Sequence, residues 1–328
     1  MQERRWLRGD THLHTNVSDG VNTPAELIEK CRAKGLDWII ITDHNKNAVG
    51  SSSFYDGGLL VIPGEEYTGS RGHMNIWGSG APELDGTRPK EYGQYIDMAA
   101  QAHERGCTVS VNHPFCSKCG WHMPLESFPA DCVEVWNMFM HPRDMTCLSW
   151  WQRQLLTGRR LPAVGGSDYH RDYFGSDLLA APTTFVYARS NSEEDVLDAL
   201  RRGSSFITDS PGGPTLVLSC GDCVQGDEVS FEPGMRVRVC AEGVKRGMTL
   251  QVFNNDRMIF ERTAERDERL EAEIPVSEKG FVRAQIVSRP RGIKLAAFRA
   301  LLRVWLPKEA KEPYGLAARC ITNPMWIV

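Results

Sequence analysis

The pattern of apolar and polar residues divides the chain into two parts. From residue 1 to about residue 208, short apolar runs alternate with amphipathic segments, as in proteins whose strands are joined by helices around a parallel sheet. Apolar residues at helical spacing, bounded by capping residues and glycines, predict helices over 23–35, 90–106 and 192–203. Buried strands are predicted over 37–42, 59–63, 107–111, 132–136 and 161–166. The pattern therefore predicts an α/β fold for this part.

Beyond a cluster of prolines and glycines at 208–214, the pattern changes. Apolar and polar residues alternate in short segments separated by turns, which is typical of an antiparallel β-sandwich. The sequence thus predicts two domains, residues 1–208 and residues 209–328, the second of them all-β and sandwich-like. Its strands are expected over 215–220, 235–242, 249–255, 269–276, 281–289 and 300–307.

Composition narrows the possible functions. The 328 residues are 41% hydrophobic and 24% charged, which is ordinary for a globular protein, and the net charge of -4 offers no electrostatic footprint for nucleic acid or an anionic membrane. No apolar run approaches the length that spans a bilayer. The first ten residues, MQERRWLRGD, contain no apolar stretch after the arginines, so no secretory signal is predicted and a cytoplasmic location is expected.

The ten cysteines include two closely spaced pairs, Cys116/Cys119 and Cys220/Cys223. A structural zinc site needs four ligands, and these pairs lie about a hundred residues apart in different predicted domains. Reduced, partly buried thiols are therefore favoured over a structural zinc site.

Candidate metal ligands follow or open nearly every strand of the N-terminal domain. His12 and His14 flank one residue, so in an extended chain both imidazoles leave the same face. The carboxyl ends of strands in a parallel barrel form one rim, where these side chains are expected to meet. The candidates are His12, His14, Asp19, Asp43, His44, Glu65, Glu66, His73, His113, Asp168 and His170.

Such a ring supplies about nine ligands, six histidines and three carboxylates, without a thiolate. Nine ligands are too many for one ion and suit two or three divalent ions, each with a position open to water or substrate. Manganese, zinc and iron all accept imidazole and carboxylate together. Of the other three histidines, His103 is expected at the surface of a helix, whereas His122 and His141 lie in long loops that could reach the rim.

The ordered motifs DTHLHTNVSDG, ITDHN, PGEEYT, GHMN, NHP and GGSDYH resemble those of the PHP superfamily, named for polymerase and histidinol phosphatase. The match covers residues 5 to about 208. It implies a distorted (β/α)7 barrel that binds up to three divalent ions. The segments RRGSSFITDSPGGP and ARCITNPMWIV further resemble the branch that includes carbaryl hydrolase, whose members carry a β-sandwich after the barrel.

The resemblance also implies a ligand set. His12 and His14 would hold one ion together with Asp168 and a bridging glutamate. His73 and His113, with the same glutamate, would hold a second ion, and Asp19, His44 and His170 a third. The family motif Gly-x-Glu favours Glu66 over Glu65 as the bridge, and Asp43 is expected to orient a histidine.

The resemblance favours a metal-dependent hydrolase of the phosphoric ester class, acting on a small-molecule phosphate ester. A hydroxide held between two ions would attack phosphorus, with Glu66 as the bridge and Asp168 as a proton shuttle. The same site suits a carbamate or aryl ester, and a third interpretation is a non-catalytic, metal-stabilised scaffold. No sequence feature fixes the oligomeric state. Candidate substrate-binding residues beside the ligand motifs are Arg71, Arg171, His122 and His141.

Overall fold

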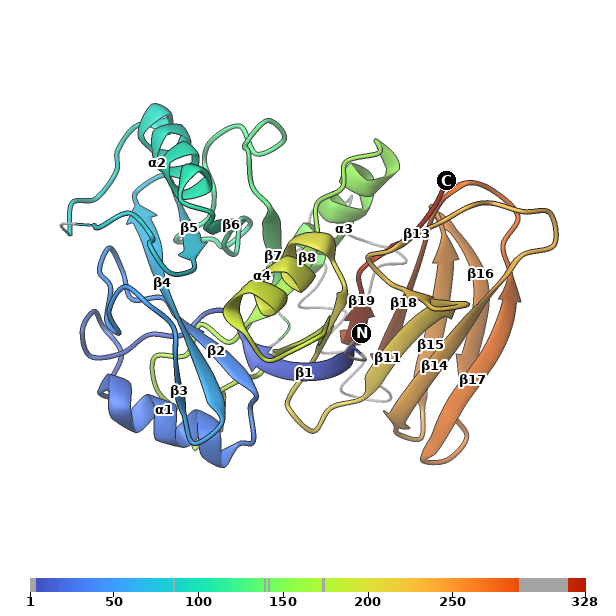
Figure 1. Cartoon of the computed structure of the whole chain (residues 1–328). Helices are drawn as coiled ribbons and strands as arrows, with labels where there is room; N and C mark the ends of the chain where they lie inside the picture. Colours follow the sequence, from blue (N-terminus) through green and yellow to red (C-terminus); the bar gives the residue numbers. More distant parts are fainter. Residues whose placement is uncertain (1–3, 85, 139, 141, 173–174, 289–317) are drawn as a thin grey trace.

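The chain folds into an α/β barrel-like domain and a β-rich domain that lie side by side (Figure 1). The structure is a computed structural model, and it describes residues 4–84, 86–138, 140, 142–172, 175–288 and 318–328. The predicted strand at 300–307 lies outside the described residues.

Seven strands of the N-terminal domain are sheet neighbours in chain order, with one antiparallel strand added beside β1. Most of the predicted strands are present at nearly the expected positions. The small hairpin strand β3 (Phe54–Asp56) pairs with β4 alone. The neighbours are β1 (Arg5–Asp10), β2 (Trp38–Ile41), β4 (Leu59–Gly69), β5 (Gly72–Trp77), β6 (Thr108–Val111), β7 (Cys132–Asn137) and β8 (Ala163–Gly166), with β9 (Thr183–Ala188) beside β1.

The sheet is mixed, so the prediction of a parallel sheet is wrong in part. β1, β2 and β4 run parallel, as do β6, β7 and β8, whereas β5 pairs antiparallel with both β4 and β6. Only Ser70 and Arg71 separate β4 from β5, and a two-residue connection allows a hairpin but no crossover to a parallel strand. β9 also pairs antiparallel with β1.

The described residues of this domain form four helices: α1 (Pro24–Ala33), α2 (Tyr92–Glu104), α3 (Pro142–Leu156) and α4 (Glu193–Arg202). α1 begins at a capping box between Thr23 and Glu26, as its sequence indicates. The pattern did not predict α3. This helix occupies part of what was expected to be a long loop after the strand predicted over 132–136. Its cysteine, leucine and tryptophans (Cys147, Leu148, Trp150, Trp151) pack into the core beside β7.

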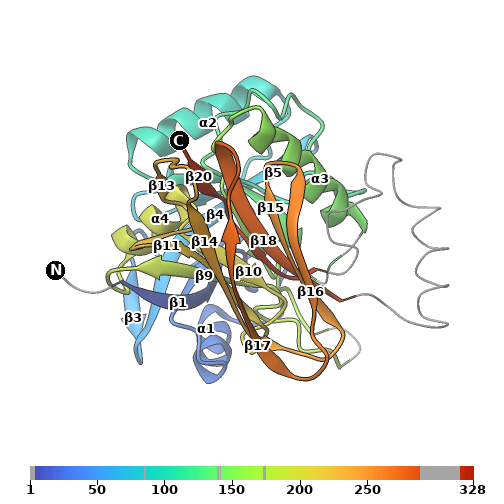
Figure 2. The same ribbon diagram turned by 90° about the vertical axis from the view of Figure 1, so that its right-hand side faces the viewer.

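The C-terminal domain consists of two facing groups of strands (Figure 2). Alternate residues of β14 and β17, such as Val237, Val239 and Leu270, are buried between them, which is why the sequence alternates. Its strands are β11 (Thr215–Cys220), β12 (Cys223–Val224), β13 (Glu228–Val229), β14 (Arg236–Val244), β15 (Met248–Asn254), β16 (Arg257–Thr263), β17 (Glu268–Pro275), β18 (Gly280–Ser288), β19 (Ala318–Thr322) and β20 (Met325–Ile327), and β10 (Ser205–Thr208) precedes them at the end of the N-terminal part.

The two parts share backbone pairing. β10, at the end of the predicted first domain, pairs antiparallel with β9 on one side and with β19 on the other. Beyond β19, the Asn323 side chain bonds to both backbone groups of Ala163 in β8. The division at residue 208 stays a prediction. β10, which ends at this residue, is hydrogen-bonded to β9 of the first part and to β19 of the second. Within the described residues, no helix has the length and apolar character needed to cross a bilayer.

Candidate metal centre

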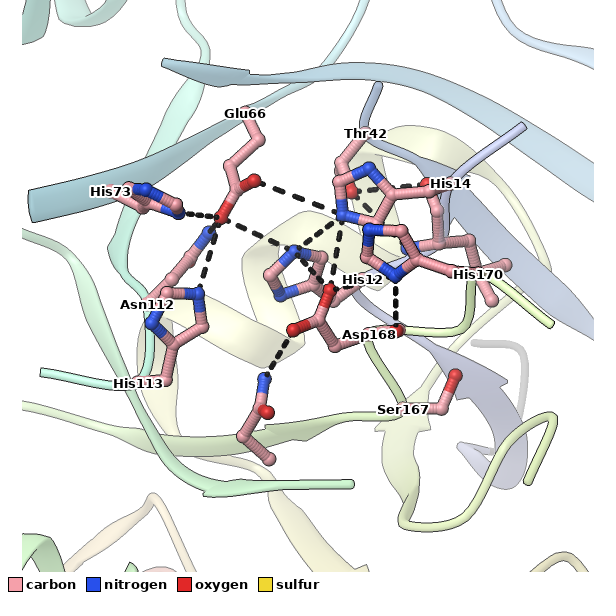
Figure 3. A network of polar contacts seen from close by, with 12 residues as sticks. His12, His14, Thr42, Glu66, His73, Asn112, His113, Ser167, Asp168 and His170 are labelled. Carbon is pink, nitrogen blue, oxygen red and sulfur yellow. Dashed lines mark hydrogen bonds and ion pairs between the residues drawn. The ribbon is translucent and has the colours of Figure 1, made fainter. Parts of the chain in front are cut away.

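The predicted ligands converge at one end of the barrel, and Figure 3 shows His12, His14, Glu66, His73, His113, Asp168 and His170 together. They follow β1, β2, β6 and β8, or lie on the β4–β5 hairpin. Two isolated backbone bridges tie these ends together, Leu13 with Tyr169 and His44 with Glu66. The first bridge brings the segment after β1 against the segment after β8, so the ends of the first and last barrel strands meet at the site.

Glu66 lies at the centre of the cluster. Its carboxylate oxygens are 2.5 Å from His44 Nδ1, 3.1 Å from His73 Nδ1, 3.3 Å from His113 Nε2 and 3.4 Å from His12 Nε2. Because β4 side chains alternate, Glu65 points to the opposite face, where its Oε2 is buried without a hydrogen-bond partner among the described residues. The structure thus places Glu66 rather than Glu65 where a bridging carboxylate would sit.

Asp168 lies beside the two histidines of the HLH motif. Its Oδ1 is 3.1 Å from His14 Nε2 and 3.4 Å from His12 Nε2, and these two nitrogens are 3.1 Å apart. Asp168 and His113 both adopt left-handed φ values, of 49° and 28°, which are unusual for residues other than glycine. Such strain is common where a site fixes the position of a side chain.

A second cluster lies next to the first. His170 Nε2 is 3.1 Å from Asp19 Oδ1, and His44 Nε2 is 3.7 Å from Asp19 Oδ2. These three residues come together as the sequence predicted, with a fourth that was not expected there, since His14 Nδ1 is 3.9 Å from Asp19 Oδ1. His14 therefore faces both clusters, one with each ring nitrogen.

Several polar residues that hold the candidate ligands were missed. Glu134 of β7 is buried; its Oε1 is 3.0 Å from His12 Nδ1, and its Oε2 accepts hydrogen bonds from the His113 backbone and the Asn137 side chain. Asn112 donates to Glu66 Oε1, and Thr68 Oγ1 lies 2.7 Å from His44 Nδ1. An acidic residue inside the apolar run CVEVW was the available signal for Glu134.

Asp43 does not orient a histidine, which corrects the expectation. Its carboxylate accepts hydrogen bonds from Thr15 and Ser18, and so fixes the loop that leads to Asp19. Asp10 has a similar structural role that the sequence did not reveal. It accepts bonds from the His12 backbone, from both the backbone and hydroxyl of Ser167, and from the Ala180 backbone.

The pKa values of the buried side chains in the site depend strongly on the charges of their neighbours. Burial opposes ionisation of Glu66, but the neighbouring imidazoles, His73 and His12 first, outweigh it and hold the pKa of the carboxyl well below its usual range. Burial likewise disfavours the charged form of His113, but the Glu66 carboxylate raises its pKa to about 9. At His14 burial prevails and lowers the pKa to about 4. The carboxylates thus need positive charge beside them, from protons or from cations.

The three predicted substrate-binding residues that the structure describes are exposed. Arg171 is exposed and donates to the backbone oxygen of Asp19, and Arg71 is exposed and donates to that of Lys90. His122 is exposed, with its backbone nitrogen bonded to Arg71. His141 lies outside the described residues. His103 is exposed on α2 and pairs with Asp131, as a surface histidine would.

The donors fit divalent ions. They are imidazole nitrogens and carboxylate oxygens, and four groups of three or more have ligand atoms within 4.8 Å of one another. His14 Nδ1 is buried and makes no hydrogen bond within the described chain, although it faces Asp19 and the second cluster. A cation in the second cluster would coordinate both His14 Nδ1 and the Asp19 carboxylate. The four groups of imidazole and carboxylate donors among the described residues are His14–Asp19–His44–His170, His12–His113–Asp168, His12–His14–Glu66 and His44–Glu66–His73.

The fold and the clusters define a two-domain PHP-like protein, with a mixed α/β region that carries a candidate multinuclear metal centre and a β-rich C-terminal domain. The PHP domain family model matches residues 10–62, which hold the first two ligand motifs. No curated protein matches the sequence.

Two proteins are among those whose solved structures are similar to this chain. One is a two-domain protein from Bacteroides vulgatus that contains a predicted PHP-like metal-dependent phosphoesterase; it is 20% identical, with a TM-score of 0.52, over 86% of this chain and 90% of that one. This similarity extends over both domains and shows the fold. The other is a lesion-specific endonuclease from Pyrococcus furiosus, 15% identical over 67% of this chain and 64% of that one, with a TM-score of 0.44.

Proposed function

We propose that this protein is a metal-dependent phosphoesterase that hydrolyses a phosphate ester of a small molecule. The observation that carries the proposal is the position of Glu66, whose two carboxylate oxygens lie within 3.8 Å of five imidazoles. A carboxylate in such a position suits two ions at once. Divalent ions would supply an activated water and neutralise the charge of the phosphoryl group. The match of residues 10–62 to the PHP domain supports this assignment.

Different residues of the site have different roles in this proposal. Glu66, His12, His14, His73 and His113 would hold the ions of the first cluster. Glu134 holds His12 through Nδ1, which leaves Nε2 directed at Glu66 and Asp168.

Asp168 is the proposed proton acceptor. Its side chain is partly accessible and its Oδ2 accepts a bond from Asn137. Burial would raise the pKa of Asp168, but His12 and His14 hold it well below the usual range, so the carboxylate is ionised and can accept a hydrogen bond from the attacking water. Asp19, His44 and His170 would hold a further ion beside a non-bridging phosphate oxygen.

A cavity of about 190 Å³ opens beside the cluster and favours a second candidate activity. Phe115, Met138 and Cys147 supply apolar surface to its lining, which also contains His113, Asn137, Arg143 and Asp144. Such a lining suits the aryl part of a leaving group. Hydrolysis of an aryl ester or carbamate at the same centre is therefore the alternative.

Initial rates on three substrates separate the two activities. Metal-loaded protein is assayed with p-nitrophenyl phosphate, bis-p-nitrophenyl phosphate and 1-naphthyl acetate. Faster turnover of a phosphate ester supports the proposal, whereas turnover of the carboxylate ester alone favours the alternative. Absence of hydrolysis with metal restored would favour a non-catalytic scaffold.

A further inference from the structure

Two cysteines lie directly behind one of the candidate ligands. Cys116 and Cys119 belong to the loop after β6, and the Cys119 thiol donates to Cys116 Sγ at 2.8 Å. Both are reduced and only half-buried. The loop is closed by bonds from the Cys116 nitrogen to His113 and from the Trp121 nitrogen to Pro114. Its curl also requires Gly120, since a Cβ there would lie 2.3 Å from the Cys116 carbonyl oxygen.

The thiol pair is connected to the centre of the site through one imidazole. Cys119 Sγ lies 3.6 Å from His113 Nδ1, and His113 Nε2 lies 3.3 Å from Glu66 Oε1. A metal-ligating histidine usually places its second ring nitrogen against an acceptor that fixes the ring. Cys119 occupies the acceptor position that Glu134 occupies for His12.

The pair is also within reach of small molecules. Cys116 lines the cavity of about 190 Å³ beside the site, together with His113 and Ser117. A small reagent that enters this cavity reaches Cys116, whose sulfur lies 2.8 Å from that of Cys119.

We propose that Cys116 and Cys119 are a redox modification site, at which a low-molecular-weight disulfide converts the two thiols into a disulfide that weakens the metal centre through His113. The effect on activity rests on the proposed function, whereas the effect on metal binding does not.

The chemistry balances as thiol–disulfide exchange. The Cys116 thiolate attacks one sulfur of the small disulfide, forms a mixed disulfide and releases one small thiol. Cys119 then attacks Cys116 Sγ, and the second small thiol leaves. The two protein thiols lose two electrons and two protons, and the reagent takes them up as two thiols. The sulfurs close from 2.8 Å to about 2 Å, and the bonded Cys119 sulfur is a weaker acceptor for His113.

A metal ion held by the thiols is the competing interpretation, since His113, Cys116 and Cys119 lie close enough to form a three-donor group. His113 would then bind ions through both nitrogens, and so would have to lose its last ring proton. One proton on Nδ1, directed at Cys119, is compatible with a ligand role for Nε2. The geometry therefore favours exchange chemistry over a further metal site.

The experiment uses the full-length, metal-loaded protein treated with bis(2-hydroxyethyl) disulfide and then with a phosphine reductant. Peptide mapping locates the disulfide, elemental analysis gives metal retained after dialysis, and p-nitrophenyl phosphate gives activity. The expected result is a Cys116–Cys119 disulfide, with metal affinity and activity lowered about tenfold and both restored on reduction.

Variants separate this effect from general oxidation. Cys116→Ser keeps Cys119 and should resist inactivation relative to its own untreated rate; Cys116→Ala serves if the first variant unfolds early. The matched control is Cys220→Ser with Cys223→Ser, because this second pair has the same spacing on β11 and β12 and should leave the response unchanged.

Three results would overturn the proposal: no disulfide between Cys116 and Cys119, a disulfide that leaves metal retention unchanged, or loss of one metal ion from reduced Cys116→Ser. If no phosphate ester is hydrolysed, the disulfide map and the metal retention still decide it, while the proposed function alone fails.

Discussion

At the scale of single residues, Glu65 and Glu66 show how strand geometry assigns different environments to identical side chains. Glu66 faces five imidazoles, whereas Glu65 is buried on the opposite side of β4. Burial raises the pKa of Glu65 to about 8, with a contribution from Glu83, so Glu65 is mostly protonated at neutral pH.

We expect Glu66→Gln to lower hydrolysis more than about 100-fold and to reduce the metal content, because an amide cannot offer two anionic oxygens to two ions. Glu65→Gln is the matched control and should retain most activity, since it replaces a side chain that is already largely neutral. Metal analysis and initial rates check both variants. A larger loss at Glu65 would contradict the assignment.

Glu65 should also shape the pH dependence of stability. Its pKa lies at 4.5 unfolded and about 8 folded, so the folded state binds the proton more tightly. This stabilisation is complete below about pH 4.5 and is lost as the pH rises to about 8. The melting temperature of Glu65→Gln should therefore fall less between pH 5 and pH 8.5 than that of the unsubstituted protein. Equal falls in melting temperature for the two proteins, measured by calorimetry, would show that Glu65 is not held neutral.

Sequence reasoning recovered the candidate ligands but not the residues that hold them. Histidines and acids after strands are visible in the sequence, since few other residue types serve as metal ligands. Glu134, Asn112 and Thr68 contact those ligands from elements distant in the chain, and only the folded structure shows these contacts. Asp43 was expected to orient a histidine, although its partners are Thr15 and Ser18.

At the scale of elements, the β4–β5 hairpin explains how a mixed sheet still gathers its ligands at one end. β5 runs back from the rim, so His73 at its start lies opposite Thr68 near the end of β4. The sequence predicted a strand over 59–63, which lies within β4. It did not predict the directions of β4 and β5, which depend on the two-residue connection between them.

The second cluster joins the segments after β1, β2 and β8, so it tests whether the barrel closes as described. His44→Ala should lower the metal content by about one ion. It should also reduce phosphate release more than aryl ester hydrolysis, because a carbonyl substrate develops charge on a single oxygen.

His103→Ala is the control for this variant, as an exposed histidine paired with Asp131 away from the rim. Its metal content and rates should match those of the unsubstituted protein. Equal losses of phosphate and ester hydrolysis in His44→Ala would contradict the role of the second cluster in holding a phosphate oxygen.

At the scale of the whole molecule, the second domain contributes to the first. β19 extends the barrel sheet through β10, where Phe206 and Ile207 are buried. Sequence patterns placed a linker after residue 208, because a Pro/Gly cluster and a change of periodicity mark a turn, but they carry no information on which distant strand pairs with β10.

A chain that ends at residue 208 should therefore fail to fold stably, since β10 would lose its partner strand and its apolar cover. Asn323→Ala is the milder test and should lower the free energy of unfolding by about 2 kcal/mol, because it leaves both backbone groups of Ala163 without their partners. Chemical denaturation measures the second variant. A stable 1–208 fragment that binds the full complement of metal would show that the domains are independent.

The central claim is that a multinuclear metal centre around Glu66 hydrolyses phosphate esters. The most direct test is the rate of p-nitrophenyl phosphate hydrolysis by chelator-treated protein as manganese is restored, with bound metal measured at each step. The account predicts no activity without metal, a rise that requires more than one ion per chain, and no rise in Glu66→Gln. Full activity with a single bound ion, or without any metal, would contradict it.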